Sequence, residues 1–206
     1  MKYVKDLRGY LFLFIRLITL NFFSSVSTLI CKMVFALKGV DLGRKNTFYG
    51  ITKTVRVPLS KIKIGDGNTF RSDESSNPIG INHRCILSTR NKDAIIEIGD
   101  NSGLSGVVIR ASEKIVIGNN VLIGANAIIT DADGHPERRP TNPKPVIIND
   151  NVWLGMNVIV LKGVEIGRNS IIGANSVVTG SIPANVIAAG NPCRVLKELK
   201  NGEEKQ

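Results

Sequence analysis

An apolar residue recurs at every sixth position along two runs in the second half of the chain. The positions are Ile117, Ile123 and Ile129 in the first run, then Ile148, Leu154, Val160, Ile166, Ile172 and Val178 in the second. Four residues after most of them stands a second small or β-branched residue, such as Val121, Ala127 and Ser170. A helix repeats about every 3.6 residues and a half-buried strand about every 2, so neither explains this period. A coil of three short strands, each about six residues long with its corner, explains a period of six. The sequence therefore predicts an all-β architecture, a parallel β-helix of hexapeptides.

The residues expected at the corners keep the same phase. Three positions after the ladder residues stand Asn120, Asn126, Asn151, Asn157, Gly163, Asn169 and Asn175. Asn and Gly tolerate positive φ better than other residues, so each of them can make a left-handed corner. The fixed phase favours β-helix corners over ordinary surface turns. The units "IGDGNT" (64–69) and "IGDNSG" (98–103) repeat the pattern less regularly, which predicts bulges or short loops in the first half.

The period fails once in the second half, between Ile129 and Ile148. The stretch reads "ITDADGHPERRPTNPKPVII" and holds His135, one of only two histidines in the chain. Its prolines limit the freedom of the chain, and we expect an excursion from the coil stack over residues 130–147. Near the C-terminus, "GNPCRVLKELKNGEEKQ" leaves the rhythm and becomes charged, which predicts a short C-terminal helix or tail.

Composition limits the kinds of partner that the chain is expected to bind. The chain has 206 residues and a formal net charge of +10, which suits one domain with a small appendage and an anionic ligand or surface. No basic run is interleaved with aromatic residues, so nucleic acid is not an expected partner. The cysteines, Cys31, Cys85 and Cys193, are odd in number and form no CxxC pair, which argues against a disulfide framework and a structural zinc site. A reducing cytoplasm is the simplest location.

Residues 11–38 are strongly apolar, with Arg16, Asn21 and several hydroxyl residues as interruptions. We find no convincing cleavage site for a signal peptide. About 20 apolar residues suffice to span a bilayer, but the interruptions favour helices that pack on the domain, on a neighbouring chain or on a membrane surface. We divide the chain into an apolar, basic helical segment (1–45), a β-helix domain (46–197) and a charged tail (198–206). Peripheral membrane association through residues 8–38 would place the protein at the inner face of the membrane.

The stretch "NVWLGMNVIVLKGVEIGRNSIIGANSVVTGSIPANVIAAGNPCRVLKEL" closely resembles the signature end of the hexapeptide-repeat acetyltransferases. The nearest branch resembles the maltose and galactoside O-acetyltransferases and the acetyltransferases of surface-polysaccharide synthesis. The resemblance covers about residues 62–199. It implies a left-handed β-helix, a homotrimer, and acetyl-CoA bound in the groove between two subunits, with no metal.

In that family the excursion carries a catalytic histidine, so the resemblance implies that His135 is the general base. An imidazole with a pKa near ~6.5 suits the removal of a proton from a hydroxyl at neutral pH. Asp131 is the preferred residue to orient the imidazole, with Asp133 and Glu137 as alternatives, although Asp also caps turns of this kind. His83 lies in the irregular coils and is expected to be structural or near the acceptor.

The resemblance also implies contacts to the acceptor and to the cofactor. Asn126, Asp133 and Trp153 are candidates for the acceptor or intermediate, while Asn126 is also a corner residue and Trp153 also suits an interface. The cofactor positions are Met156, Ala174, Thr179, Gly180, Arg194 and Lys197, the last two as cations for the phosphates. Met156 stands where a small or polar residue is common, and Gly180 where Lys or Arg is common.

The expected function is therefore an acetyl-CoA-dependent O-acetyltransferase acting on a sugar or a surface-polysaccharide precursor. An N-acetyltransferase of an amino sugar and a xenobiotic acetyltransferase are the alternatives. A zinc site of carbonic-anhydrase type would need three histidines, and the chain has two. A purely structural β-helix would not need His135 together with the cofactor residues.

Overall fold

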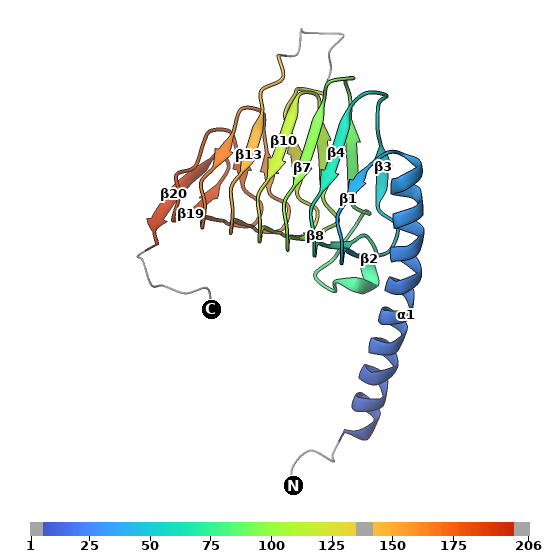
Figure 1. The fold of residues 1–206 in the computed structure, drawn as a ribbon. Helices are drawn as coiled ribbons and strands as arrows, with labels where there is room; N and C mark the ends of the chain where they lie inside the picture. The colour runs from blue at the N-terminus through green and yellow to red at the C-terminus, as the bar shows by residue number, and fades with distance from the viewer. Residues whose placement is uncertain (1–5, 135–141, 200–206) are drawn as a thin grey trace.

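The computed structural model describes residues 6–134 and 142–199. Its strands form three sheets that wrap around one core, with one strand of each sheet in every full coil (Figure 1). All strand pairs are parallel except the last pair of sheet B. Sheet A contains β1 (Asp41–Leu42), β4 (Lys61–Ile64), β7 (Ile95–Ile98), β10 (Lys114–Ile117), β13 (Val146–Ile148) and β16 (Glu165–Ile166). Sheet B contains β2 (Thr47–Tyr49), β5 (Thr69–Arg71), β8 (Gly103–Ser105), β11 (Leu122–Ile123), β14 (Trp153–Leu154), β17 (Ile171–Ile172), β19 (Val186–Gly190) and β20 (Cys193–Glu198). Sheet C contains β3 (Lys53–Val55), β6 (Ile86–Thr89), β9 (Val108–Ala111), β12 (Ile128–Thr130), β15 (Ile159–Val160) and β18 (Val177–Val178).

The six-residue ladder forms the core, as the sequence predicted. Ile117 pairs with Ile148 in sheet A, and Ile129 pairs with Val160 in sheet C. All nine ladder residues are buried. The stacking of like side chains on successive coils therefore fills a narrow interior with Ile, Leu and Val rather than with aromatic rings.

The corner asparagines adopt the left-handed conformation, which confirms the second part of the prediction. Asn120, Asn126, Asn151, Asn157, Asn169 and Asn175 have φ between 55° and 63°. Their side chains also bond from coil to coil. Asn151 Nδ2 donates to Asn169 Oδ1 (3.1 Å), and Asn169 Nδ2 donates to Asn185 Oδ1 (2.8 Å).

The first half departs from the strict period, also as expected. Between β5 and β6 the chain leaves the stack over residues 72–85, which we call the β5–β6 loop. This loop contains a short 3-10 helix, η1 (Glu74–Ser76). Arg71 Nη1 donates to Ser76 O (2.7 Å), and Asn77 Nδ2 donates to Ser105 Oγ (3.2 Å). The loop is thus held against the coils by side-chain contacts.

A single long helix, α1 (Leu7–Leu37), lies across the N-terminal end of the stack and continues beyond its edge (Figure 1). Its second half buries Ser24, Ser27, Cys31 and Phe35. Phe35 packs edge-on against Phe48, which stacks on Phe70 at 4.9 Å between ring centroids. The second half therefore packs on the domain, one of the arrangements expected from the sequence. The first strand already begins at Asp41, inside the segment 1–45 that we had assigned to the helical region.

The C-terminal end corrects one expectation. We expected a short helix or tail, whereas Cys193–Glu198 forms strand β20, which pairs antiparallel with β19. Ala189 pairs with Arg194, and Ile187 with Lys197. The last coil leaves an unpaired edge on sheet B, and its backbone groups are satisfied by a returning strand. Residues 200–206 lie outside the described part of the chain.

Candidate functional site

The break in the period lies at the corner between sheets C and A, where the chain leaves β12 and returns at β13. The structure describes this excursion up to Gly134 and again from Asn142. His135, the predicted base, and Glu137, an alternative orienting residue, lie outside the described residues. Their roles therefore stay predictions.

Asp131 anchors the start of the excursion. Its side chain is buried, and its carboxylate accepts hydrogen bonds from the backbone N–H groups of Ser112 and Glu113, each at 2.7 Å. The Asp131 backbone oxygen accepts from Lys144 N (2.9 Å), which ties the start of the excursion to its return. This geometry supports the turn-capping alternative for Asp131. An orienting role toward His135 stays a prediction.

Asp133 stands two residues further into the excursion and is largely exposed. Its carboxylate forms an ion pair with Lys162, which belongs to the next corner of the same edge. This pair lies at the mouth of the excursion and gives the exposed carboxylate a cationic partner.

Asn126 is engaged with the β5–β6 loop. Its Nδ2 donates to Gly80 O (2.8 Å), and its Oδ1 accepts from Asn82 N (3.0 Å). Both ends of the amide are thus used to dock this loop onto the corner, so an acceptor contact by Asn126 stays a prediction. His83 lies in the same loop, half-buried, with Nδ1 3.2 Å from Arg84 O.

An open hollow of about 730 Å³ adjoins this histidine. It is lined by Lys53, Ser72, Asp73, Glu74, Ile81, Asn82, His83, Arg84 and Ile86. Sequence reasoning placed His83 near the acceptor as one option but missed Lys53 and Arg84. No sequence signal marked them, because residues about 30 positions apart are brought together only by coil stacking.

Trp153 lies on the outer side of sheet B and is 45% exposed. It is in register with Leu122 on the preceding coil. Together with Arg71 and Gly103 these two residues line an open hollow of about 390 Å³. A wall of an acyl or acceptor site and an interface contact are both compatible with this exposed position.

Three of the predicted cofactor residues lie along one edge of the prism, at the corner between sheets B and C. Met156 and Ala174 occupy equivalent places on successive coils, where Asn175 N donates to Met156 O (2.9 Å). A Cβ added at Gly155 would lie 2.6 Å from Ala174 N, so the backbones approach closely here. Arg194 continues the edge, because its partner Ala189 lies against Gly173.

The other predicted cofactor residues are placed apart from that edge. Thr179 and Gly180 follow β18 and are exposed at the corner between sheets C and A. Lys197 is exposed on β20, three residues beyond Arg194. The structure therefore groups Met156, Ala174 and Arg194 on one edge. The other three residues, Thr179, Gly180 and Lys197, lie outside this group, about one strand away from it.

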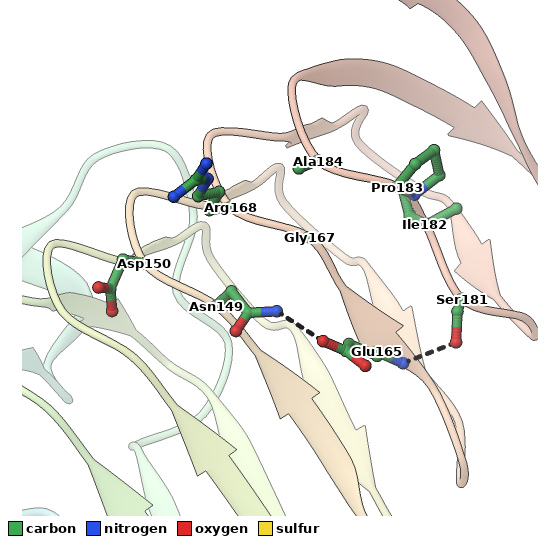
Figure 2. A pocket seen from close by; sticks show the side chains of 9 residues that line it. All are labelled: Asn149, Asp150, Glu165, Gly167, Arg168, Ser181, Ile182, Pro183 and Ala184. Atoms are coloured by element: carbon green, nitrogen blue, oxygen red, sulfur yellow. Dashed lines mark hydrogen bonds between the residues drawn. The ribbon is translucent and has the colours of Figure 1, made fainter.

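A further groove of about 800 Å³ lies at the opposite corner, between sheets A and B (Figure 2). It is lined by Asn149, Asp150, Glu165, Gly167, Arg168, Ser181, Ile182, Pro183 and Ala184. Asn149 Nδ2 donates to Glu165 Oε1 (3.0 Å), and Glu165 N donates to Ser181 Oγ (3.1 Å). Its carboxylates and hydroxyl are occupied by structural bonds, and we assign no chemistry to it.

The three cysteine thiols are free and buried. Burial raises the pKa of the Cys31, Cys85 and Cys193 thiols, so these groups stay protonated and poorly nucleophilic. Among the described residues, no group of three His, Cys, Asp or Glu side chains could hold a metal ion.

Comparisons with known proteins agree with the hexapeptide repeat of the coils. The family model described as bacterial transferase hexapeptide (six repeats) matches residues 145–180, and the hexapeptide repeat of succinyl-transferase matches residues 114–134. YJL218W of Saccharomyces cerevisiae, named as a candidate acetyltransferase, is 41% identical over 160 residues, which are 68% of this chain and 80% of the yeast protein. The chain belongs to the hexapeptide-repeat acetyltransferase family. It is an acyltransferase with the left-handed parallel β-helix fold, as the resemblance implied.

Two further proteins are similar to the chain, one in sequence and one in fold. The present chain is 43% identical to the galactoside O-acetyltransferase of Escherichia coli over 96 residues, which are 44% of the chain and 47% of that relative. It thus spans about half of the bacterial protein. AntD of Bacillus cereus, an N-acyltransferase solved with dTDP and 3-hydroxybutyryl-CoA, superposes with a TM-score of 0.64 at 21% identity, over 82% of this chain and 88% of AntD. At that identity the likeness concerns the fold.

Proposed function

We propose that the protein is an acetyl-CoA-dependent O-acetyltransferase that works as a homotrimer on a hydroxyl of a sugar or of a surface-polysaccharide precursor. The observation that carries the proposal is the anchored excursion. The hexapeptide ladder breaks once in the second half, at the place where His135 stands, and Asp131 ties the start of the excursion to the stack and to Lys144. The identity with the galactoside O-acetyltransferase supports the O-acetyl assignment.

His135 acts as the general base in this proposal. The neutral imidazole takes the proton of the acceptor hydroxyl as its oxygen attacks the carbonyl carbon of the thioester. The tetrahedral intermediate collapses with cleavage of the C–S bond, and the imidazolium returns the proton to the sulfur of coenzyme A. The protein thiols take no part, because burial keeps them protonated.

The edge of Met156, Ala174 and Arg194 is the proposed donor site. The small Ala174 leaves the backbone of the coil open to the pantetheine arm, whose amides can bond with backbone N–H and C=O groups. Arg194 and Lys197 supply cations for the phosphates of the donor. Thr179 and Gly180 are proposed for the adenine end. A neighbouring subunit would close the groove, which accounts for the exposed apolar side chains Leu122 and Trp153 on the outer faces.

The alternative is N-acylation of an amino sugar, since AntD, an N-acyltransferase, shares the fold. A panel of acceptors distinguishes the two. Release of coenzyme A from acetyl-CoA should rise with sugars that lack an amine, and the product should be an ester that alkaline hydroxylamine cleaves. A product formed only from amino sugars and resistant to hydroxylamine would establish the alternative.

Two variants test the assignment of the base. His135→Ala should reduce acetyl transfer about 10²–10⁴-fold, the usual contribution of a positioned general base, with acetyl-CoA affinity unchanged. His83→Ala is the matched control and should retain most of the activity. Equal losses in both variants would contradict the assignment of His135.

A third variant tests the donor site. Arg194→Ala with Lys197→Ala should weaken acetyl-CoA binding by about 1–3 kcal/mol, as expected for charge-assisted hydrogen bonds. Lys61→Ala with Lys63→Ala, two exposed cations on sheet A, is the control in calorimetry.

A further inference from the structure

The face of α1 that points away from the β-helix carries a continuous apolar stripe. Seven side chains at intervals of three or four residues form it: Leu11, Ile15, Ile18, Phe22, Val26, Leu29 and Met33. Each is between 42% and 65% exposed. We call this set the outer stripe. At about 1.5 Å per residue it runs for about 33 Å along the helix.

The outer stripe lies opposite the side of α1 that packs on the coils. The buried residues Ser24, Ser27, Cys31 and Phe35 follow the same helical spacing on the other side. Thr28 Oγ1 accepts from Phe48 N (2.9 Å), which fixes the rotation of the helix about its axis. Figure 1 shows α1 across the N-terminal end of the stack. The outer stripe, on the side of α1 opposite its buried residues, therefore faces away from the coils.

The charges beside the outer stripe are all of one sign. Arg8 and Lys32 stand beside the stripe and are exposed, whereas Arg16 Nη2 donates to Ser75 O (3.4 Å) on the side of the coils. The helix has no Asp or Glu between Leu7 and Leu37. A second copy of the same helix would bring like charges together without an acidic partner, which disfavours pairing. Anionic headgroups complement these cations, and the long side chains can reach them while the stripe is buried.

Length and packing favour a helix that lies on the bilayer rather than one that crosses it. By length and composition alone, α1 could cross a membrane. Its second half is committed to the coils through Cys31 and Phe35, however, which leaves about 17 residues, the lower limit for a span. Arg8 and Arg16 fall within that remainder, and charges at the centre of a bilayer are costly.

We propose that α1 docks the N-terminal end of the β-helix onto an anionic bilayer. The helix lies along the membrane surface, with the outer stripe in the boundary between headgroups and acyl chains and the cations among the headgroups. The coils then stand on the membrane by one end. This inference does not depend on the acetyl acceptor or on the identity of the catalytic base.

Flotation of the full chain with vesicles tests the proposal. Binding is expected to vesicles of phosphatidylcholine and phosphatidylglycerol, and more weakly to phosphatidylcholine alone. Ile18→Gln with Phe22→Gln should reduce partitioning at least about 10-fold for each side chain withdrawn from lipid. Arg8→Gln with Lys32→Gln should reduce it about fivefold per cation on anionic vesicles only.

Leu196→Gln is the matched control, since this exposed leucine lies on β20 at the other end of the stack. It should float like the parent. All variants should keep the parent's urea midpoint, because the substituted side chains face away from the core. Absence of parent binding to either vesicle, or vesicle binding unchanged by Ile18→Gln with Phe22→Gln, would overturn the proposal. If the parent chain does not bind vesicles, and substitution of the outer stripe lowers the mass measured by light scattering, a second copy of the chain covers the stripe.

Discussion

Asn126 offers the sharpest test of how the β5–β6 loop is held. The residue has φ of 63° at its corner, and its side chain makes two hydrogen bonds to the loop, one with Gly80 O and one with Asn82 N. We consider two substitutions, Asn126→Ala and Asn126→Gly. Both remove the side-chain bonds, but only glycine adopts the left-handed corner without strain.

The structure gives the expected magnitudes. Each of the two hydrogen bonds contributes about 1 kcal/mol, and a non-glycine residue in the left-handed region costs about 1–2 kcal/mol. Asn126→Ala should therefore lower the free energy of unfolding by about 3–4 kcal/mol, and Asn126→Gly by about 2 kcal/mol. The difference between the two variants isolates the strain at the corner.

Asn157 provides the matched control one coil further on. It has φ of 55°, and its Nδ2 donates to Asn175 Oδ1 (3.0 Å) rather than to a loop. Asn157→Gly should cost about 1 kcal/mol and leave the β5–β6 loop docked.

Urea unfolding measures the global effect, and limited trypsinolysis at the exposed Arg84 reports on the loop itself. If Asn126→Gly weakens loop docking by about 2 kcal/mol, the open population and the rate of cleavage should rise about 30-fold. Asn157→Gly should be cleaved at the parent rate. Equal cleavage of the two glycine variants would show that Asn126 does not hold the loop, and the reasoning from its two bonds would be refuted.

Three further expectations concern buried or closely packed groups. Asp131→Asn should lower the free energy of unfolding, measured in urea, by about 2–3 kcal/mol, because one of the two backbone N–H groups bonded to this carboxylate loses its acceptor. The control, Asp133→Asn at an exposed ion pair, should lower it by less than about 0.5 kcal/mol. Equal losses in the two variants would contradict the anchoring role of Asp131. Gly155→Ala should destabilise by about 1–3 kcal/mol in thermal unfolding, since its Cβ would meet backbone at 2.6 Å, and an unchanged melting temperature would count against such tight corners. The buried Cys85 thiol should resist an aromatic disulfide reagent at about pH 8 and react after denaturation. Burial raises its folded pKa above the ordinary 9.0, so its contribution to stability is present below that pH and declines as the pH rises beyond it.

The parts of the fold that local residue chemistry determines were predictable. The ladder and the corner asparagines follow from the period, because each coil repeats the same short-range choice of an apolar core residue and a left-handed turn. Their positions matched the structure residue by residue, as at Ile117 above Ile148 and at Asn169.

The remainder depends on contacts between distant residues. The docking of Gly80 on Asn126 joins positions 46 residues apart, and no local pattern announces it. Strand β20 forms because the last coil leaves an edge to cover, which the charged sequence of Cys193–Glu198 does not reveal by itself. The carboxylate of Asp131 was singled out for the histidine, yet its bonds to Ser112 and Glu113 depend on the stacking of one coil on another.

The anchoring of Asp131 has an evolutionary consequence. Because Asp131 and Lys144 are bonded to each other across the base of the excursion, the coils above and below are completed without the residues between them. Lengthening a closed loop costs only about 0.6 kcal/mol for each doubling of its length. The segment that carries His135 can therefore gain or lose residues in related sequences while the coils on either side of it keep their register.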